Sequence, residues 1–155
     1  MVLMDIANKR DREAGLTLIE LLAVVVILGI IAGIAVISIS QLIQTSKTKA
    51  FLANAYTLRD AAHFYLKEKL VREEEYDGEI SYKLLLENGY IEPIKDPDTG
   101  ELLEPSDESF VEVKNGKLYA VMLIGVERML SKKSDRAASP VPLDELSADD
   151  IVTKN

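Results

Sequence analysis

Residues 21–37 form an unbroken run of seventeen apolar or glycine residues, and this run restricts the fold more than any other feature. The apolar character continues to Ile43, interrupted only by two serines and one glutamine. A helix from Leu16 to Ile43 would be about 42 Å long at 1.5 Å per residue, which is enough to cross a bilayer core of about 30 Å. A strand of that length is implausible, so the sequence predicts a membrane-spanning helix.

The chain beyond this run has the composition of a domain that folds in water. All nine aromatic residues lie after residue 50. Residues 46–71 contain no Gly or Pro, and apolar side chains recur there at the spacing of one helical face. These are Phe51, Ala55, Leu58, Ala62 and Tyr65, with Lys49, Asp60, His63 and Lys67 on the opposite side. The pattern predicts one continuous helix of about fifty residues that ends at the charged segment 72–75, before Gly78.

A β-hairpin is the strongest local prediction in the second half of the chain. Asn115-Gly116 separates two strand-like segments, 110–114 and 117–123, and this dipeptide suits the two positive φ angles of a type I′ turn. In the simplest register, Val113 lies opposite Leu118 and Val111 lies opposite Ala120. The hairpin would then present one apolar face.

The remaining segments are predicted mainly from composition. Residues 81–88 resemble a short helix, with Ser81 as N-cap and Gly89 as the stop. Residues 92–109 are rich in Pro, Asp, Glu and Gly and form a loop by composition. The last residues, 131–155, are polar, and we expect a flexible tail with at most one helical turn at 143–146.

These elements together predict an α+β chain. We expect a leader at 1–15, a transmembrane or filament-core helix at 16–45, and a head at 46–130 that combines the amphipathic helix with a two- or three-stranded antiparallel sheet. The flexible tail would follow at 131–155.

The composition excludes several classes of function. The chain has no Cys, hence no disulfide, zinc–thiolate site or thiol nucleophile, and its single His leaves little material for a catalytic triad or a histidine metal cluster. The formal net charge of −8 opposes non-specific binding of nucleic acid. We therefore expect no catalytic residue, and for His63 a solvated position or a contact between subunits.

The loop 92–109 is a candidate for binding calcium, since carboxylate oxygens are the ligands that this ion prefers. Asp96 and Asp98 would be the ligands, but the spacing in DPDTGE does not match an EF-hand loop. A solvated acidic loop is the favoured alternative, and no other cofactor is predicted.

Glu20 is the single acidic residue near the start of the apolar run. A carboxylate in a membrane helix is unfavourable at the bilayer centre and less so near the interface, where the helix dipole favours it. Gly29 and Gly33 have the small-xxx-small spacing that allows close approach of helices. Both features suit contacts between helices, although a headgroup-level acid and an ordinary lipid-facing glycine pair are the simpler alternatives.

The string Gly15-Leu-Thr-Leu-Ile-Glu20-Leu-Leu, between a charged leader and a long apolar run, resembles the prepilin signature of type IV pilins and pseudopilins. The match departs from the usual pattern at Leu16, where Phe is common, and at Ile37, where many members have Pro. The resemblance implies cleavage after Gly15 and methylation of the new amine of Leu16. It also implies that this amine pairs with Glu20 of a neighbouring subunit in the filament. A secretory signal peptide fits less well, because its cleavage site follows its apolar stretch.

The resemblance also implies partners and a location. The partners would be copies of the chain itself, minor pilins, a prepilin peptidase, and an assembly platform with its ATPase. The chain would be a single-pass protein of the cytoplasmic membrane and later part of an extracytoplasmic or cell-surface filament. A surface pilus, a secretion pseudopilus and a DNA-uptake pseudopilus all remain open, as does a membrane-anchored binding protein that never polymerises.

Overall fold

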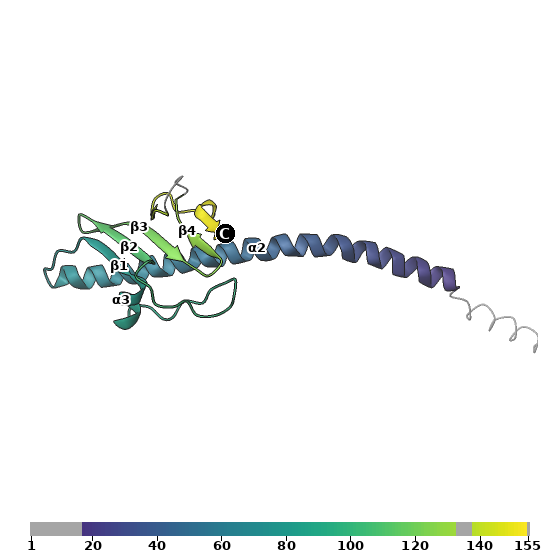
Figure 1. The fold of residues 1–155 in the computed structure, drawn as a ribbon, viewed down its shortest axis with the longest axis horizontal. Coiled ribbons are helices and arrows are strands. Elements are labelled where there is room, and N and C mark those ends of the chain that lie inside the picture. Colours follow the sequence, from purple (N-terminus) through teal and green to yellow (C-terminus); the bar gives the residue numbers. More distant parts are fainter. Residues whose placement is uncertain (1–16, 133–137, 155) are drawn as a thin grey trace, which may run out of the picture. The chain divides into compact units, whose positions relative to one another are not determined.

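The computed structural model describes residues 17–132 and 138–154, and it has an α+β architecture (Figure 1). The long helix is α2, Leu18–Val71, and the short helix is α3, Tyr82–Glu87. The strands are β1 (Gly78–Ser81), β2 (Phe110–Lys114), β3 (Lys117–Ile124), β4 (Arg128–Leu130), β5 (Val141–Pro142) and β6 (Ile151–Thr153), and a 3₁₀ turn, η1, covers Ala148–Asp150. The chain divides into two compact units between Ile43 and Gln44.

The long helix confirms the predicted continuity through residue 71. It ends where Glu73 adopts a φ of 57°, and the Glu73 and Glu74 amides donate to the Leu70 and Lys69 carbonyls, each at 3.0 Å. This is the hydrogen-bond pattern of a Schellman motif, with Glu in the position that Gly usually takes. The predicted short helix is also confirmed, with the Ser81 hydroxyl accepting from the Leu84 amide at 3.2 Å.

The second unit contains one antiparallel sheet and one core. The strand order is β1-β2-β3-β4-β6, and β5 pairs with β3. The predicted helical stripe supplies one side of the core, and the sheet supplies the other; Phe51, Ala55, Leu58 and Val111 are all fully buried there. This burial of one helical face against the sheet explains why the apolar spacing of residues 51–65 is regular.

The hairpin is confirmed, but its predicted register is wrong beyond the turn. Asn115 and Gly116 have φ of 53° and 67°, and Val113 lies opposite Leu118. A bulge at Glu112/Val113 then places Val111 opposite Val121 rather than Ala120. The bulge brings two fully buried valines together and turns Tyr119 outward, where its ring lies 3.9 Å from the Lys114 ammonium.

The expected flexible tail is also wrong for residues 138–154. Val141 is buried and pairs with Val121, and Ile151 pairs with Leu130, so β5 and β6 complete a sheet of six strands instead of two or three. Between them, Ser147 and Asp150 form a capping box around η1. The polar composition of this segment concealed a few apolar residues that are enough to join an existing sheet edge. The strand β1 was likewise not predicted.

Candidate processing and assembly site

Glu20 lies in the first turn of α2. The carbonyl of Thr17 accepts from the Glu20 amide at 2.9 Å and from the Leu21 amide at 3.2 Å, and these bonds start the helix. The carboxylate is exposed, and among the described residues it has no ion pair. A negative charge at a helix N-terminus is favoured by the helix dipole, so Glu20 is compatible with this helix without a partner in its own chain.

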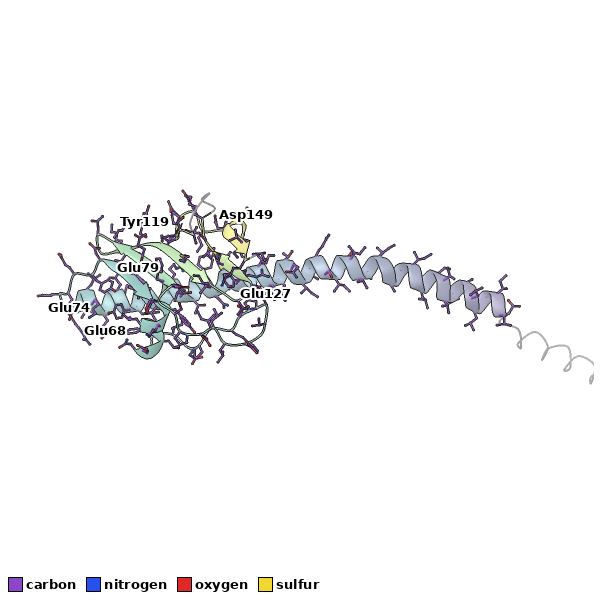
Figure 2. All side chains as sticks on the ribbon, in the orientation of Figure 1. Glu68, Glu74, Glu79, Tyr119, Glu127 and Asp149 are labelled. Carbon is purple, nitrogen blue, oxygen red and sulfur yellow. The ribbon has the colours of Figure 1, made fainter. Side chains whose placement is uncertain are left out.

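The apolar half of α2 has no cover within the described part of the chain. Every large apolar side chain from Leu18 to Ile43 is at least 47% exposed, and Figure 2 shows side chains projecting all around this stretch. A Cβ added at Gly29 or Gly33 would meet no atom within 4 Å. By length and composition α2 is able to cross a membrane. The described residues of the chain therefore leave this apolar surface open.

The predicted cleavage residues, Gly15 and Leu16, lie outside the described residues, so their processing stays a prediction. The first described residue, Thr17, leads directly into the helix at Leu18. A cut after Gly15 would leave the helix and Glu20 intact.

Residues 10–36 match the prokaryotic N-terminal methylation motif. The matched range includes the junction, Glu20 and both glycines of the apolar run. It is the signature of a type IV pilin-like precursor. This motif implies processing by a prepilin peptidase and polymerisation with other pilins, and together with the long apolar helix it indicates membrane anchoring. No curated protein and no solved structure matches the chain.

The acidic loop 92–109 is attached to the head at two aspartates, although most of its residues are exposed. The Asp96 side chain is buried, and its two oxygens accept from the backbone amides of Asp98 at 2.7 Å and Val126 at 2.8 Å. Asp96 therefore fastens the loop to the turn between β3 and β4. The expectation of a solvated loop is therefore wrong at Asp96, which is buried. The two hydrogen bonds are what make this burial tolerable, because a buried carboxylate without them would be unfavourable.

Asp98 forms the second attachment of the loop. Its carboxylate, 1% exposed, pairs with Nε and Nη2 of Arg128, and Lys47 Nζ lies 3.6 Å from Oδ1. The other donors of Arg128 reach α2, with Nη1 at 2.9 Å from the Thr48 hydroxyl and Nη2 at 3.5 Å from Gln44 Oε1. The hydrogen bond from Arg128 holds the pKa of Asp98 below its usual range.

These contacts bear on the calcium prediction for Asp96 and Asp98. The described residues contain no group of three or more His, Cys, Asp or Glu placed to hold a metal ion. Calcium binding by this loop stays a prediction, and an ion there would compete with Arg128 for the Asp98 carboxylate.

No feature of the sequence alone points to Arg128. It begins a short strand, and its partner lies thirty residues earlier in a loop. A single Arg carries no motif, so only the fold brings the pair together. His63, in contrast, is exposed beside Phe64, as expected for a residue on the polar face of the helix.

Proposed function

We propose that this chain is a structural subunit of a type IV pilus or pseudopilus, cut after Gly15, methylated at Leu16 and polymerised through its N-terminal helix. The observation that supports this most strongly is the single acidic residue, Glu20, at the start of a helix whose apolar surface is left uncovered by the described residues of its own chain. Lipid covers that surface before assembly, and neighbouring helices cover it afterwards.

In a filament core, an unpaired carboxylate would be strongly unfavourable. Cleavage after Gly15 creates an amine on Leu16, and this amine would pair with Glu20 of the next subunit. The pairing would offset both charges and set the axial position of one helix against its neighbour. Gly29 and Gly33 would allow close approach of backbones at the same interface.

The partners of the proposed subunit are further copies of itself, minor pilins, the prepilin peptidase, and an assembly platform with its ATPase. The head would present the outer surface of the filament and carry no catalytic residue. Secretion and DNA uptake are compatible with the same subunit.

The proposal is tested by intact mass and by electron microscopy. Protein extracted from the membrane should have lost residues 1–15 and gained one methyl group, and sheared surface material should contain filaments that include the chain. A mass that retains Met1, or a cut beyond Ile43, would contradict the proposal.

A further inference from the structure

A shallow groove lies between the last turns of α2 and the hairpin turn. Its lining is mostly apolar because of three leucines, Leu66, Leu70 and Leu118, and it is completed by His63, Lys67, Gly116 and Lys117. We call these seven residues the lysine groove. It belongs to the end of the head near the Glu74 label in Figure 2.

The lysine groove is unusual for this chain because its charged side chains are both cationic. The whole chain has 26 acidic and 18 basic residues, and the lining of this groove has no Asp or Glu, although Glu75 and Asp77 line the hollow that adjoins it at Leu70 and Lys117. Lys67 and Lys117 are exposed, and neither has an ion pair with any described residue. Leu70 is 49% exposed beside them. Such a surface favours an apolar side chain flanked by carboxylates.

The loop before β2 carries a segment of that chemistry. Leu102 is 62% exposed, and Glu101 and Glu104 on either side of it are exposed as well. Neither glutamate has an ion pair with any part of the chain that the structure describes. We call these three residues the Leu102 knob.

The Leu102 knob cannot reach the lysine groove of its own head. It is placed by Lys95, which pairs with Leu102 and whose carbonyl accepts from Asn54 Nδ2 at 2.9 Å. Lys67 lies about 20 Å further along the helix than Asn54, at a rise of 1.5 Å per residue. The two surfaces are therefore separate parts of one head.

We propose that the lysine groove of one subunit binds the Leu102 knob of a second copy of this chain. Leu102 would pack against the three leucines of the groove, and Glu101 and Glu104 would pair with Lys67 and Lys117. Because the two surfaces differ, the contact is heterologous and leaves an unused groove and an unused knob at the two ends of each pair. Repetition of such a contact produces rings or open filaments. The inference rests on the proposed function, to which it adds a contact between heads.

Disulfide trapping in the full chain tests the contact, since the native sequence has no Cys. Two tagged copies, one with Leu102→Cys and one with Leu70→Cys, are co-expressed, oxidised in the membrane and again after detergent extraction, and examined for the mixed dimer. Lys83→Cys, an exposed position outside the groove, replaces Leu70→Cys in the matched control. We expect the mixed dimer to exceed the control by about tenfold; equal yields would overturn the proposal.

Charge reversal tests the chemistry of the contact. Lys67→Glu with Lys117→Glu in the Leu70→Cys copy should lower the yield of mixed dimer about tenfold, because like charges facing each other across an interface are unfavourable. Glu101→Lys with Glu104→Lys in the Leu102→Cys copy should restore it. The pairing would be overturned if the two Lys→Glu substitutions left the yield of mixed dimer unchanged, or if the two Glu→Lys substitutions failed to restore it. The near-ultraviolet signal of the tyrosines shows whether each charge-reversed variant is folded. A variant that has lost this signal is replaced by the corresponding Gln variant.

The outcome is separable from that of the proposed function. Normal processing and filaments without the mixed dimer would refute only the contact between heads. A specific mixed dimer in a chain that is neither cut after Gly15 nor found in filaments would refute the proposed function and leave the contact standing.

Discussion

Arg128 and Asp98 form a nearly buried, bidentate ion pair that joins the start of β4 to the acidic loop. Arg128 also donates a hydrogen bond to the Thr48 hydroxyl on α2. Their side chains are 10% and 1% exposed. One guanidinium thus connects three segments that are far apart in the sequence. Arg can pair with a carboxylate in this planar, bidentate geometry, and Lys cannot.

Replacement of Arg128 by Ala should destabilise the head strongly. The Asp98 carboxylate would remain buried with only Lys47 nearby, and breaking a buried ion pair costs about 3–5 kcal/mol. The change is measured as the melting temperature of the full chain in detergent, followed by the near-ultraviolet signal of the six tyrosines, all of which lie in the head.

The matched control is Arg72→Ala. Arg72 pairs with Glu68 at 2.5 Å, but both side chains are well exposed, so the loss should be below about 1 kcal/mol. Equal effects of the two substitutions would show that the Arg128 pair is no stronger than a surface pair.

The same pair predicts a loss of stability in acid. The hydrogen bond from Arg128 is the main cause that lowers the pKa of Asp98 from its usual 3.8. A carboxyl group whose pKa is lowered by folding stabilises the folded state above the unfolded pKa, and that contribution is lost as the pH falls through the folded pKa. The melting temperature should therefore drop below about pH 4.

Asp98→Asn supplies the comparison for this pH dependence. The variant should melt at a lower temperature than the parent at pH 7, because it leaves Arg128 without its counter-charge. Its melting temperature should vary less below about pH 4. Parallel profiles for the two proteins would assign the acid sensitivity to other carboxyl groups.

Gly125→Ala should destabilise the head through overpacking. An added Cβ would lie 2.6 Å from Phe51 Cε2, 2.8 Å from Asp96 Oδ2 and 3.1 Å from the Arg128 carbonyl oxygen. Extra atoms in a packed core cost about 1–3 kcal/mol. The melting temperature measures the effect, and Phe51→Leu in the same chain should recover part of it if the ring is the main obstacle.

Gly116→Val tests a different cause, the backbone of the hairpin turn. A Cβ at Gly116 would meet no atom within 4 Å, but the φ of 67° is unfavourable for a β-branched residue. We expect a loss of at least about 1 kcal/mol. Gly116→Asn, which tolerates this φ, should recover most of the stability; a melting temperature unchanged in the Val variant would contradict the turn assignment.

The elements that could be predicted from the sequence are those determined by residues close together in the chain. The end of α2, the Ser81 cap and the Asn115-Gly116 turn depend on neighbouring residues, so the sequence predicted them. The bulge that brings Val111 opposite Val121 depends on which side chains the core admits, and the edge strands β5 and β6 depend on a sheet that already exists. Local patterns contain neither kind of information.

The candidate sites divide in the same way. Glu20 was found because its signature is contiguous with the apolar run, whereas Arg128 and the lysine groove were not, because they combine residues from distant segments. Asp96 was noticed for its charge, but its role as an acceptor for backbone amides appears only when the loop is folded.

The last prediction concerns Glu20, which lies exposed in the first turn of α2 and has no ion pair among the residues that the structure describes. Glu20→Gln keeps the size and hydrogen-bonding capacity of the side chain and removes its charge. Membrane insertion should persist or improve, since a carboxylate is unfavourable in lipid. Cleavage after Gly15 should persist as well, because the junction is unchanged.

Filament assembly should fall steeply, since the Leu16 amine of each subunit would enter an apolar core without a counter-charge. Sheared filaments are quantified against the membrane pool of cleaved protein, with Glu73→Gln, at an exposed position just beyond the C-terminal end of α2, as the control for loss of one charge. A normal filament yield from cleaved, inserted Glu20→Gln protein would show that this charge is dispensable for assembly.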